Sequence, residues 1–208
     1  MFRDRADAGR KLGVALKKYK EKGVVVLAIP RGGVPVGYEI AKALGCKLEL
    51  IIARKLPFPY EPEAGFGAVA ETGDVVLKKE LLAYADLTKR DIENIKQQQL
   101  QEIRERIKKL RQGKELDIKG KTVIIVDDGL AAGSTMEAAI IAAKKKGAAK
   151  IIVAVPTASI SVLQDVKKKA DEVVCLDERR FFRAVADAYE EWHDLSDEEV
   201  MEIMARTK

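Results

Sequence analysis

The chain of 208 residues is 47% hydrophobic and 34% charged, with a formal net charge of +5 and two cysteines. This length fits one medium-sized domain with a buried core. No apolar run approaches the ~20 residues of a membrane-spanning helix, and the amino terminus lacks the apolar stretch of a signal peptide. Two cysteines provide no disulfide framework. The composition argues against a membrane protein and a disulfide-stabilised secreted domain, so we expect a cytoplasmic protein.

Basic residues outnumber acidic ones only slightly, 38 to 33. Two runs of three lysines, at 144–146 and 167–169, stand where predicted helices end, and there they complement the negative end of the helix dipole. Aromatic residues make up only 5% of the chain, too few for a base-stacking platform. We therefore expect no nucleic-acid partner and no membrane partner.

Strand-like runs of Val, Ile and Leu alternate with helix-like stretches along the chain. The predicted helices are residues 5–19, 35–44, 134–146 and 159–169. The predicted strands are residues 24–29, 48–53, 122–126, 151–155 and 172–176. Nearly continuous apolar strands that alternate with helices indicate a parallel sheet covered on both faces. The predicted fold class is therefore α/β, doubly wound, with a mainly parallel five-stranded sheet.

An insertion at residues 55–119 separates the second predicted strand from the third. Its first eight residues contain three prolines, which we expect to prevent regular structure there. A short hairpin is predicted from strands at 67–70 and 75–77.

A long helix is predicted to fill the second half of the insertion. It begins at Thr88, where Asp91 completes a capping box, and it ends at Gly113. Its apolar stripe, which Gln99 interrupts, consists of Ile92, Ile95, Ile103, Ile107 and Leu110. The stripe packs either on the sheet or on a second subunit, and the pattern does not distinguish the two.

The tail, residues 178–208, holds the aromatics Phe181, Phe182, Tyr189 and Trp192. One of them would stack on a planar ring, or their helical spacing would place them in the core, and both readings remain open. We expect His193 to face solvent rather than to act as a catalyst. A final helix is predicted to begin at Ser196, with Glu199 completing a capping box. We expect one domain over residues 1–208, with core segments 5–54 and 120–177, the insertion 55–119 and the tail as a hood.

Two adjacent carboxylates and a glycine-containing loop follow the third predicted strand. Residues 127–135 read Asp-Asp-Gly-Leu-Ala-Ala-Gly-Ser-Thr, and a helix begins at Ser134. Ligands of open α/β sheets bind at the carboxyl ends of strands, and a glycine loop before a helix N-terminus binds phosphate. Asp127 and Asp128 stand before this loop as acceptors for vicinal hydroxyls or a hydrated metal. A phosphate close to a diol describes ribose 5-phosphate.

Other interpretations of this loop fit less well. An ordinary turn with an aspartate as helix N-cap needs only one carboxylate. No lysine follows the second glycine, as a P-loop requires, and no G-x-G-x-x-G follows a strand. A response-regulator-like domain, with Mg²⁺ on the acid pair, leaves the sequence Arg31-Gly32-Gly33 without a purpose.

The run at 123–135 resembles the phosphoribosyl pyrophosphate motif of the type I phosphoribosyltransferase family: an apolar strand, two acids, a small-residue loop, a glycine and hydroxyl residues. The resemblance implies that Asp127 and Asp128 contact the ribose hydroxyls. It implies a 5-phosphate site made of Gly129, Leu130, Ala131, Ala132, Gly133, Ser134 and Thr135. The family often has Thr in place of Ala132, and its hypoxanthine and guanine enzymes have Asp in place of Ala131, which argues against a 6-oxopurine acceptor.

Basic residues follow the first two predicted strands. Arg31, Gly32 and Gly33 resemble the family's pyrophosphate loop, although a plain turn is the alternative. Arg54 and Lys55 stand where basic residues of the family precede a mobile loop that closes over pyrophosphate. The resemblance implies that these basic side chains surround the leaving group.

The family implies a transferase that uses phosphoribosyl pyrophosphate with Mg²⁺, passes the phosphoribosyl group to a nitrogenous acceptor and releases pyrophosphate. Its catalytic residues would be Asp127, Asp128, Arg54 and Lys55, with Glu71 as a candidate base. Mg²⁺ would arrive mainly on the substrate, with Asp127 or Asp128 as a ligand. A homodimer is common in the family and is expected here, and the acceptor is unidentified. The alternative is a non-catalytic protein that senses phosphoribosyl pyrophosphate or ribose 5-phosphate.

Overall fold

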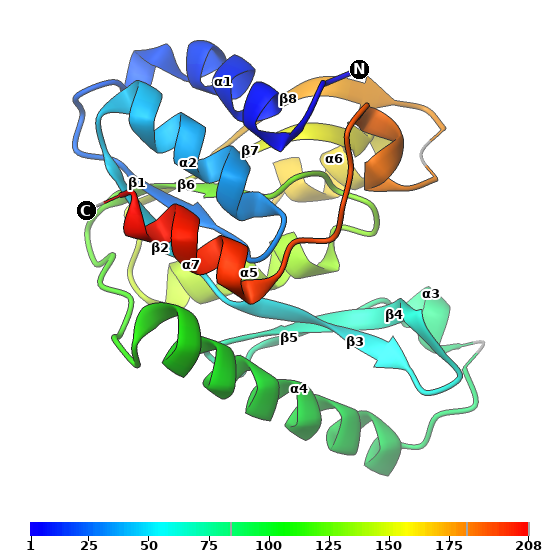
Figure 1. The fold of residues 1–208 in the computed structure, drawn as a ribbon. Helices are drawn as coiled ribbons and strands as arrows, with labels where there is room; N and C mark the ends of the chain where they lie inside the picture. Colours follow the sequence, from blue (N-terminus) through cyan, green and yellow to red (C-terminus); the bar gives the residue numbers. More distant parts are fainter. Residues whose placement is uncertain (84, 182, 208) are drawn as a thin grey trace.

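A five-stranded parallel sheet forms the centre of the computed structural model, which describes residues 1–83, 85–181 and 183–207 (Figure 1). The strands are β1 Val25–Ala28, β2 Lys47–Leu50, β6 Thr122–Val126, β7 Lys150–Ser159 and β8 Glu172–Arg179. Their order is β2-β1-β6-β7-β8, and every neighbouring pair is parallel. The predicted α/β class is confirmed, although β7 and β8 run several residues further than their apolar cores indicated.

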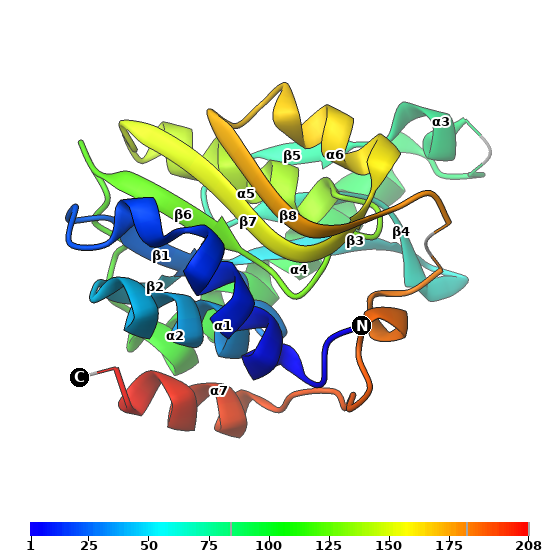
Figure 2. The ribbon, with the colours of Figure 1, turned by 90° about the horizontal axis from the view of Figure 1, so that it is seen from above.

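Helices cover both faces of this sheet (Figure 2). They are α1 Arg5–Ala15, α2 Gly33–Leu44, α5 Ser134–Lys145 and α6 Ile160–Lys167, and a short 3₁₀ turn, Lys17–Tyr19, follows α1. Alternate strand residues point to opposite faces. Val26 and Ile124 pack in the cluster that holds α1 and α2, whereas Val25 and Ile125 pack in the cluster that holds α5 and α6. Both faces are therefore buried, as the near-continuous apolar strands predicted.

The carboxyl-terminal helix α7, Asp197–Ala205, packs against α2 and against the long helix of the insertion, α4 Lys89–Arg111. The predicted capping box is present: the Ser196 side chain accepts from the Glu199 N–H, and the Glu199 side chain accepts from the Ser196 N–H. In the part of the chain that the structure describes, no helix combines the length and the apolarity needed to cross a membrane.

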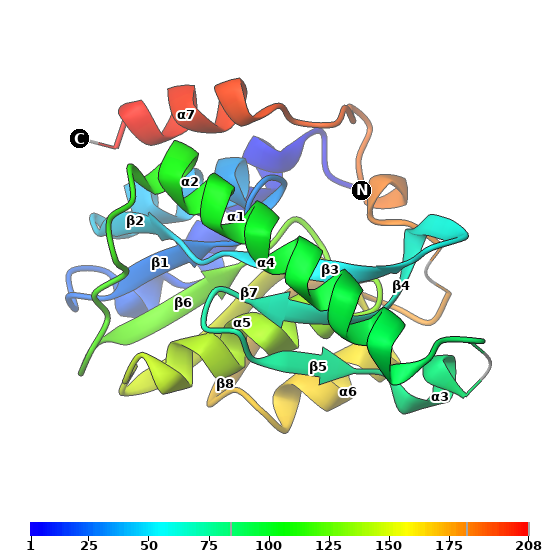
Figure 3. The same cartoon turned by 90° about the horizontal axis from the view of Figure 1, so that it is seen from below.

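The insertion builds a second, antiparallel sheet that lies between α5 and α4 (Figure 3). Its elements are β3 Ala53–Phe58, β4 Glu61–Ala70, β5 Val75–Leu77, the short helix α3 Lys79–Leu82, and α4 Lys89–Arg111. The expectation that the prolines prevent regular structure is wrong. The β3–β4 register shifts on both sides of Pro57, and a bulge of this kind accommodates a residue that has no N–H to donate. The predicted hairpin at 67–70 and 75–77 is the β4–β5 pair.

The long helix α4 packs on the second sheet through the predicted stripe. Its capping box at Thr88 and Asp91 is present. The helix ends slightly before the predicted Gly113, with Gln112 already in the left-handed region at φ 54°. Ile103 and Leu110 are buried, so the stripe covers a sheet of its own chain.

A buried ion pair holds the end of α4 to the junction between the two sheets. Arg111 Nη1 lies 2.6 Å from Glu71 Oε2, and their side chains are 7% and 3% exposed. The same arginine donates to the carbonyl of Leu50 at 3.3 Å and to that of Lys114 at 2.7 Å. Glu71 also accepts from the Ile52 N–H at 3.0 Å. Removing either partner leaves the other buried without its main counter-charge.

We predict that Arg111→Met lowers the free energy of unfolding by about 2 kcal/mol, because it removes the closer of the two cations that neutralise the buried Glu71 carboxylate and leaves only Lys146. Arg104→Met is the matched control, since Arg104 is exposed on the same helix. Urea denaturation followed by circular dichroism measures both. A loss of less than about 1 kcal/mol for Arg111→Met would contradict the assigned role of the pair.

Candidate functional site

Two loops meet where the adjacent strands β1 and β6 end. A Cβ added to Gly32 would lie 1.9 Å from Oδ2 of Asp128, and one added to Gly33 would lie 2.6 Å from the carbonyl oxygen of Val126. Only glycine permits this approach, because a Cβ would overlap the neighbouring loop. The peptide bond before Arg31 is cis. The structure thus brings the predicted Arg31-Gly32-Gly33 loop against the predicted acid pair.

The second half of the acidic loop forms the entry to α5. Gly133 has a left-handed φ of 75°, and a Cβ there would lie 2.5 Å from Cγ1 of Val162. Ala131 and Ala132 are exposed, whereas Ser134 is buried at the first position of the helix. The N–H of Leu130 donates to the Thr157 carbonyl at 3.0 Å and fixes the loop to β7. Exposed small residues before a helix N-terminus leave room for an anion.

The two carboxylates occupy different environments. Asp128 is buried, and Asp127 is the more accessible of the two. Oδ1 of Asp127 accepts from the Asp128 N–H at 2.9 Å. Burial, and then the charge of Asp128, raise the pKa of Asp127 well above its ordinary value. Burial also raises the pKa of Asp128, and the Arg5 guanidinium opposes that rise. The pair therefore holds a proton more tightly than two free aspartates would.

Arg5, in the first turn of α1, contacts the acid pair and the tail together. Its Nε donates to Asp128 Oδ2 at 2.9 Å, and its Nη1 donates to the carbonyl of His193 at 2.9 Å. The guanidinium carbon lies 3.7 Å from the centroid of the Trp192 ring. The hydroxyl of Tyr189 donates to the Asp128 carbonyl at 2.6 Å. The contacts of Arg5 join residues more than 120 positions apart, and no local sequence pattern predicted them.

The aromatic residues of the tail do not act as one group. Tyr189 is buried and packs against Phe2, with ring centroids 5.8 Å apart, so the core interpretation holds for it. Phe181 is 93% exposed, and Phe182 lies outside the described residues. The His193 side chain faces solvent, as predicted, and its Nε2 lies 2.9 Å from Glu199 Oε1.

Arg31, which follows β1, is exposed, whereas Arg54, which follows β2, lies beside α4 of the insertion. Arg54 donates from Nε to Gln99 Oε1 at 2.8 Å and pairs with Glu102. The polar side chain of Gln99 within the apolar stripe is explained by this hydrogen bond with Arg54. Further along α4, Arg106 has a lowered pKa because of its burial and then the charge of Arg54, with a further contribution from Arg31. Arg106 was not identified from the sequence. The available signal was its spacing of seven residues from Gln99, which places two polar side chains along the same side of the helix.

Lys55 and Glu71 are the remaining residues for which the sequence predicted a catalytic role. Lys55 is exposed on β3, next to Arg54. Glu71, the candidate base, is engaged in a buried ion pair instead: its carboxylate lies 2.6 Å from Arg111 and 3.3 Å from Lys146.

No group of three or more His, Cys, Asp or Glu side chains that could hold a metal occurs among the described residues. The acid pair supplies hard oxygen ligands at the edge where β1 and β6 end, and Asp128 already bonds to Arg5. Mg²⁺ is commonly bound through one or two carboxylates together with substrate phosphates. The residues present therefore fit a magnesium ion carried by the ligand, with Asp127 as the available protein oxygen.

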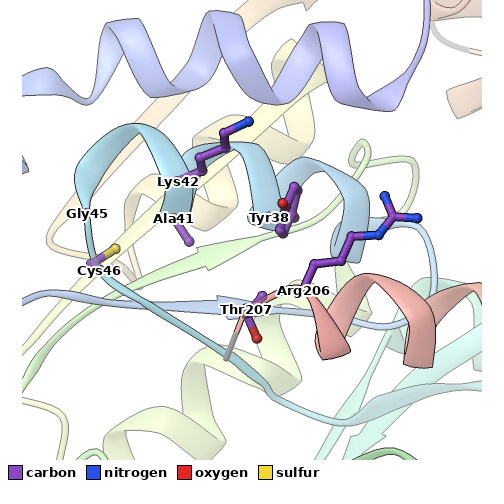
Figure 4. Close-up of a pocket in the computed structure, with 7 residues that line it drawn as sticks. All are labelled: Tyr38, Ala41, Lys42, Gly45, Cys46, Arg206 and Thr207. Atoms are coloured by element: carbon purple, nitrogen blue, oxygen red, sulfur yellow. The ribbon is translucent and has the colours of Figure 1, made fainter.

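Two cavities lie away from these loops. One, of about 270 Å³, is lined by Tyr38, Ala41, Lys42, Gly45, Cys46, Arg206 and Thr207 (Figure 4). The other, of about 430 Å³, lies between β2, the end of α4 and α7. Because α2 starts in the site at Gly33 and reaches the first cavity at its far end, this cavity is at the opposite edge of the sheet.

A family model described as phosphoribosyl transferase domain matches residues 66–191 of the chain. The chain belongs to this family. The resemblance seen in the loop at 123–135 is thus confirmed.

Similar proteins extend this phosphoribosyl transferase likeness beyond the matched region. A protein of Mycobacterium tuberculosis, known from strains CDC 1551 and H37Rv, has the provisional name phosphoribosyl transferase and is 39% identical over 99% of this chain. The chain spans 47% of the length of that protein. The crystal structure of TT1426 from Thermus thermophilus superposes with a TM-score of 0.80 at 38% identity, covering 99% of this chain and 98% of the other.

We predict that Asp127→Asn stabilises this phosphoribosyl transferase domain at neutral pH. A carboxyl whose pKa is raised by folding binds its proton more tightly in the folded state, so it reduces stability as pH rises above its ordinary pKa of about 3.9. The advantage of Asp127→Asn in melting temperature should therefore grow from pH 4 upward.

Asp74→Asn is the control of opposite sign. A hydrogen bond from Thr72 lowers the pKa of Asp74, so this carboxylate stabilises the fold above its ordinary pKa. Its replacement should cost stability at pH 7, and the cost should vanish as pH falls through the lowered pKa. Equal melting temperatures of Asp127→Asn and the wild type at all pH values would contradict the assigned environment of Asp127.

Proposed function

We propose that the protein binds phosphoribosyl pyrophosphate with Mg²⁺ at the edge where β1 and β6 end, transfers the phosphoribosyl group to a nitrogenous acceptor and releases pyrophosphate. The contact of the Gly32-Gly33 loop with Asp128 carries the proposal. It places two loops suited to anions on either side of a carboxylate pair. A ligand with a phosphate at one end, a diol in the middle and a diphosphate at the other end matches this order of groups.

The 5-phosphate is assigned to the loop that opens α5. Its exposed residues Ala131 and Ala132 leave the backbone accessible, and the helix N-terminus adds a positive dipole. The hydroxyls of Ser134 and Thr135 provide further donors. The alanine at position 132 removes one side-chain hydrogen bond, worth about 0.5–1.5 kcal/mol, that a threonine would provide.

The ribose hydroxyls are assigned to the acid pair. Asp127 is the more accessible carboxyl and is the main acceptor in this proposal. Asp128 contributes its remaining oxygen, because Arg5 occupies Oδ2. As the bond at the anomeric carbon breaks, positive charge develops on the ribose ring, and the nearby carboxylates stabilise it.

The diphosphate is assigned to a group of cations contributed by three segments. Arg31 follows β1, Arg54 lies on β3 with Lys55, and Arg106 lies on α4. In the reaction the bond from the anomeric carbon to the diphosphate oxygen breaks, and its electron pair leaves with pyrophosphate. A nitrogen lone pair forms the new bond, and the nitrogen loses its proton to water or to the leaving group. Guanidinium groups that face the departing oxygens lower this barrier.

Mg²⁺ bound to the diphosphate would neutralise part of the charge that gathers on the leaving group. Asp127 is the protein oxygen that would contact it. The tail would hold the acceptor, since Val185 lies against Gly129 and Tyr189 bonds to Asp128. Ala131 in place of an aspartate argues against a 6-oxopurine as acceptor.

A sensor that binds phosphoribosyl pyrophosphate without transferring it is the second candidate. The placement of possible bases among the described residues supports it. Glu71 is paired with Arg111 and Lys146, His193 faces solvent beside Glu199, and Asp128 is engaged with Arg5. A sensor needs the binding loops and has no use for a base.

We predict that Mg²⁺-phosphoribosyl pyrophosphate binds the wild type with micromolar affinity in calorimetric titration and that the double substitution Asp127→Asn, Asp128→Asn abolishes measurable binding. The amides keep the shape of the pair and remove the charged acceptors. Asp165→Asn, an exposed change on α6, should bind as the wild type does. No binding to the folded wild type would reject both candidate functions.

We further predict that pyrophosphate release, assayed with a panel of purine, pyrimidine and amine acceptors, falls roughly 100-fold in Arg54→Met. Arg54 is proposed to stabilise the leaving group, whereas the control Arg104→Met changes an exposed arginine of the same charge. Binding without pyrophosphate release from any acceptor would reject the transferase and favour the sensor.

A further inference from the structure

Arg5 occupies a position that the helix itself does not favour. It is the first residue of α1, where Asp4 caps the helix and Asp7 adds the expected acidic group. A cation in the first turn opposes the helix dipole. The residue is nevertheless only 7% exposed. A buried arginine at a helix N-terminus is stable only because its partners lie elsewhere in the fold.

Those partners fix Asp128 on three sides. Arg5 donates to Oδ2 of its carboxylate at 2.9 Å. Gly32 packs so closely against the same oxygen that a Cβ would lie 1.9 Å from it. The hydroxyl of Tyr189 donates to the backbone carbonyl at 2.6 Å. Asp128 therefore has little freedom to turn toward a ligand, whereas Asp127 is more accessible.

The same guanidinium reaches the tail. Its Nη1 donates to the His193 carbonyl at 2.9 Å, and its central carbon lies over the Trp192 ring at 3.7 Å. Trp192 in turn packs on Tyr189, with ring centroids 5.3 Å apart. One side chain thus contacts the acidic loop and the segment that lies over it.

We propose that Arg5 is a positioning residue, which holds the Asp128 carboxylate against the Gly32 loop and ties it to the tail through Trp192 and His193. Asp128 then presents only its remaining oxygen, in a fixed direction, and Asp127 is the main carboxyl that meets the ligand. Because one guanidinium joins the acidic loop to the tail, a change in the tail alters the ribose subsite. The consequence for ligand binding rests on the proposed function, whereas the hold on Asp128 does not.

A ligand-free measurement tests the hold on Asp128. The charged and titratable groups that face this carboxyl are Arg5 from α1, Asp127 from its own loop and the Tyr189 phenol from the tail. Carbon-13 NMR of aspartate-labelled protein follows the Asp128 carboxyl, which Asp128→Asn assigns. In Arg5→Gln its titration midpoint should rise by about one pH unit or more, because the favourable charge is gone. Arg5→Lys should retain part of the effect.

Arg3→Gln is the matched control, since Arg3 lies two residues away, pairs with Asp4 and has a side chain 60% exposed. It should leave the Asp128 midpoint unchanged. A midpoint in Arg5→Gln equal to that of the wild type would overturn the proposal. If Arg5→Gln does not fold, Trp192→Leu decides, because it removes the ring against which the Arg5 guanidinium lies. An unchanged Asp128 midpoint and an unchanged ligand affinity in Trp192→Leu would then overturn the proposal.

Calorimetry with Mg²⁺-phosphoribosyl pyrophosphate tests the link to the tail. Arg5→Gln and Trp192→Leu should each weaken binding about tenfold while Arg5→Lys stays closer to the wild type. Wild-type affinity in Trp192→Leu would reject the link. If the wild type itself does not bind, the proposed function fails, and the NMR titration still decides the role of Arg5 on Asp128.

Discussion

The contact between the loops that follow β1 and β6 is the constraint on which the site depends. Two parallel strands that pair residue by residue end at the same level, so their loops must meet. The loops meet without collision only because positions 32 and 33 are glycines. This arrangement puts the Arg31 loop, the acid pair and the N-terminus of α5 within one short edge. Every role proposed for these residues follows from that proximity.

The sequence predicted those features that local physics determines. The apolar runs located the strands. The capping boxes at Thr88 and Ser196 located the starts of two helices, because a capping box depends only on side chains and backbone groups a few residues apart. The β3–β4 hairpin was missed. Pro57 has no N–H to donate, and the bulge that accommodates it forms only against the partner strand β4, which the local sequence does not reveal. Arg5 was missed for the same reason, since its partner Asp128 lies 123 residues away.

The insertion contributes to the candidate site as well as to the scaffold. Gln99 interrupts an apolar stripe, and its contact with Arg54 explains the interruption. Arg106 lies further along the same helix. Its pKa is lowered by its burial and by the nearby positive charges of Arg54 and Arg31. Like charges that converge in a partly buried place are typical of anion sites. The long helix α4 thus extends the basic surface toward the expected diphosphate.

A crystal structure of the protein with Mg²⁺ and phosphoribosyl pyrophosphate tests the central claim most directly. The account predicts the 5-phosphate at the N-terminus of α5, the ribose hydroxyls on Asp127 and the diphosphate beside Arg31. A ligand bound in the cavity at the far end of α2, or ordered and empty loops at a saturating ligand concentration, would contradict it.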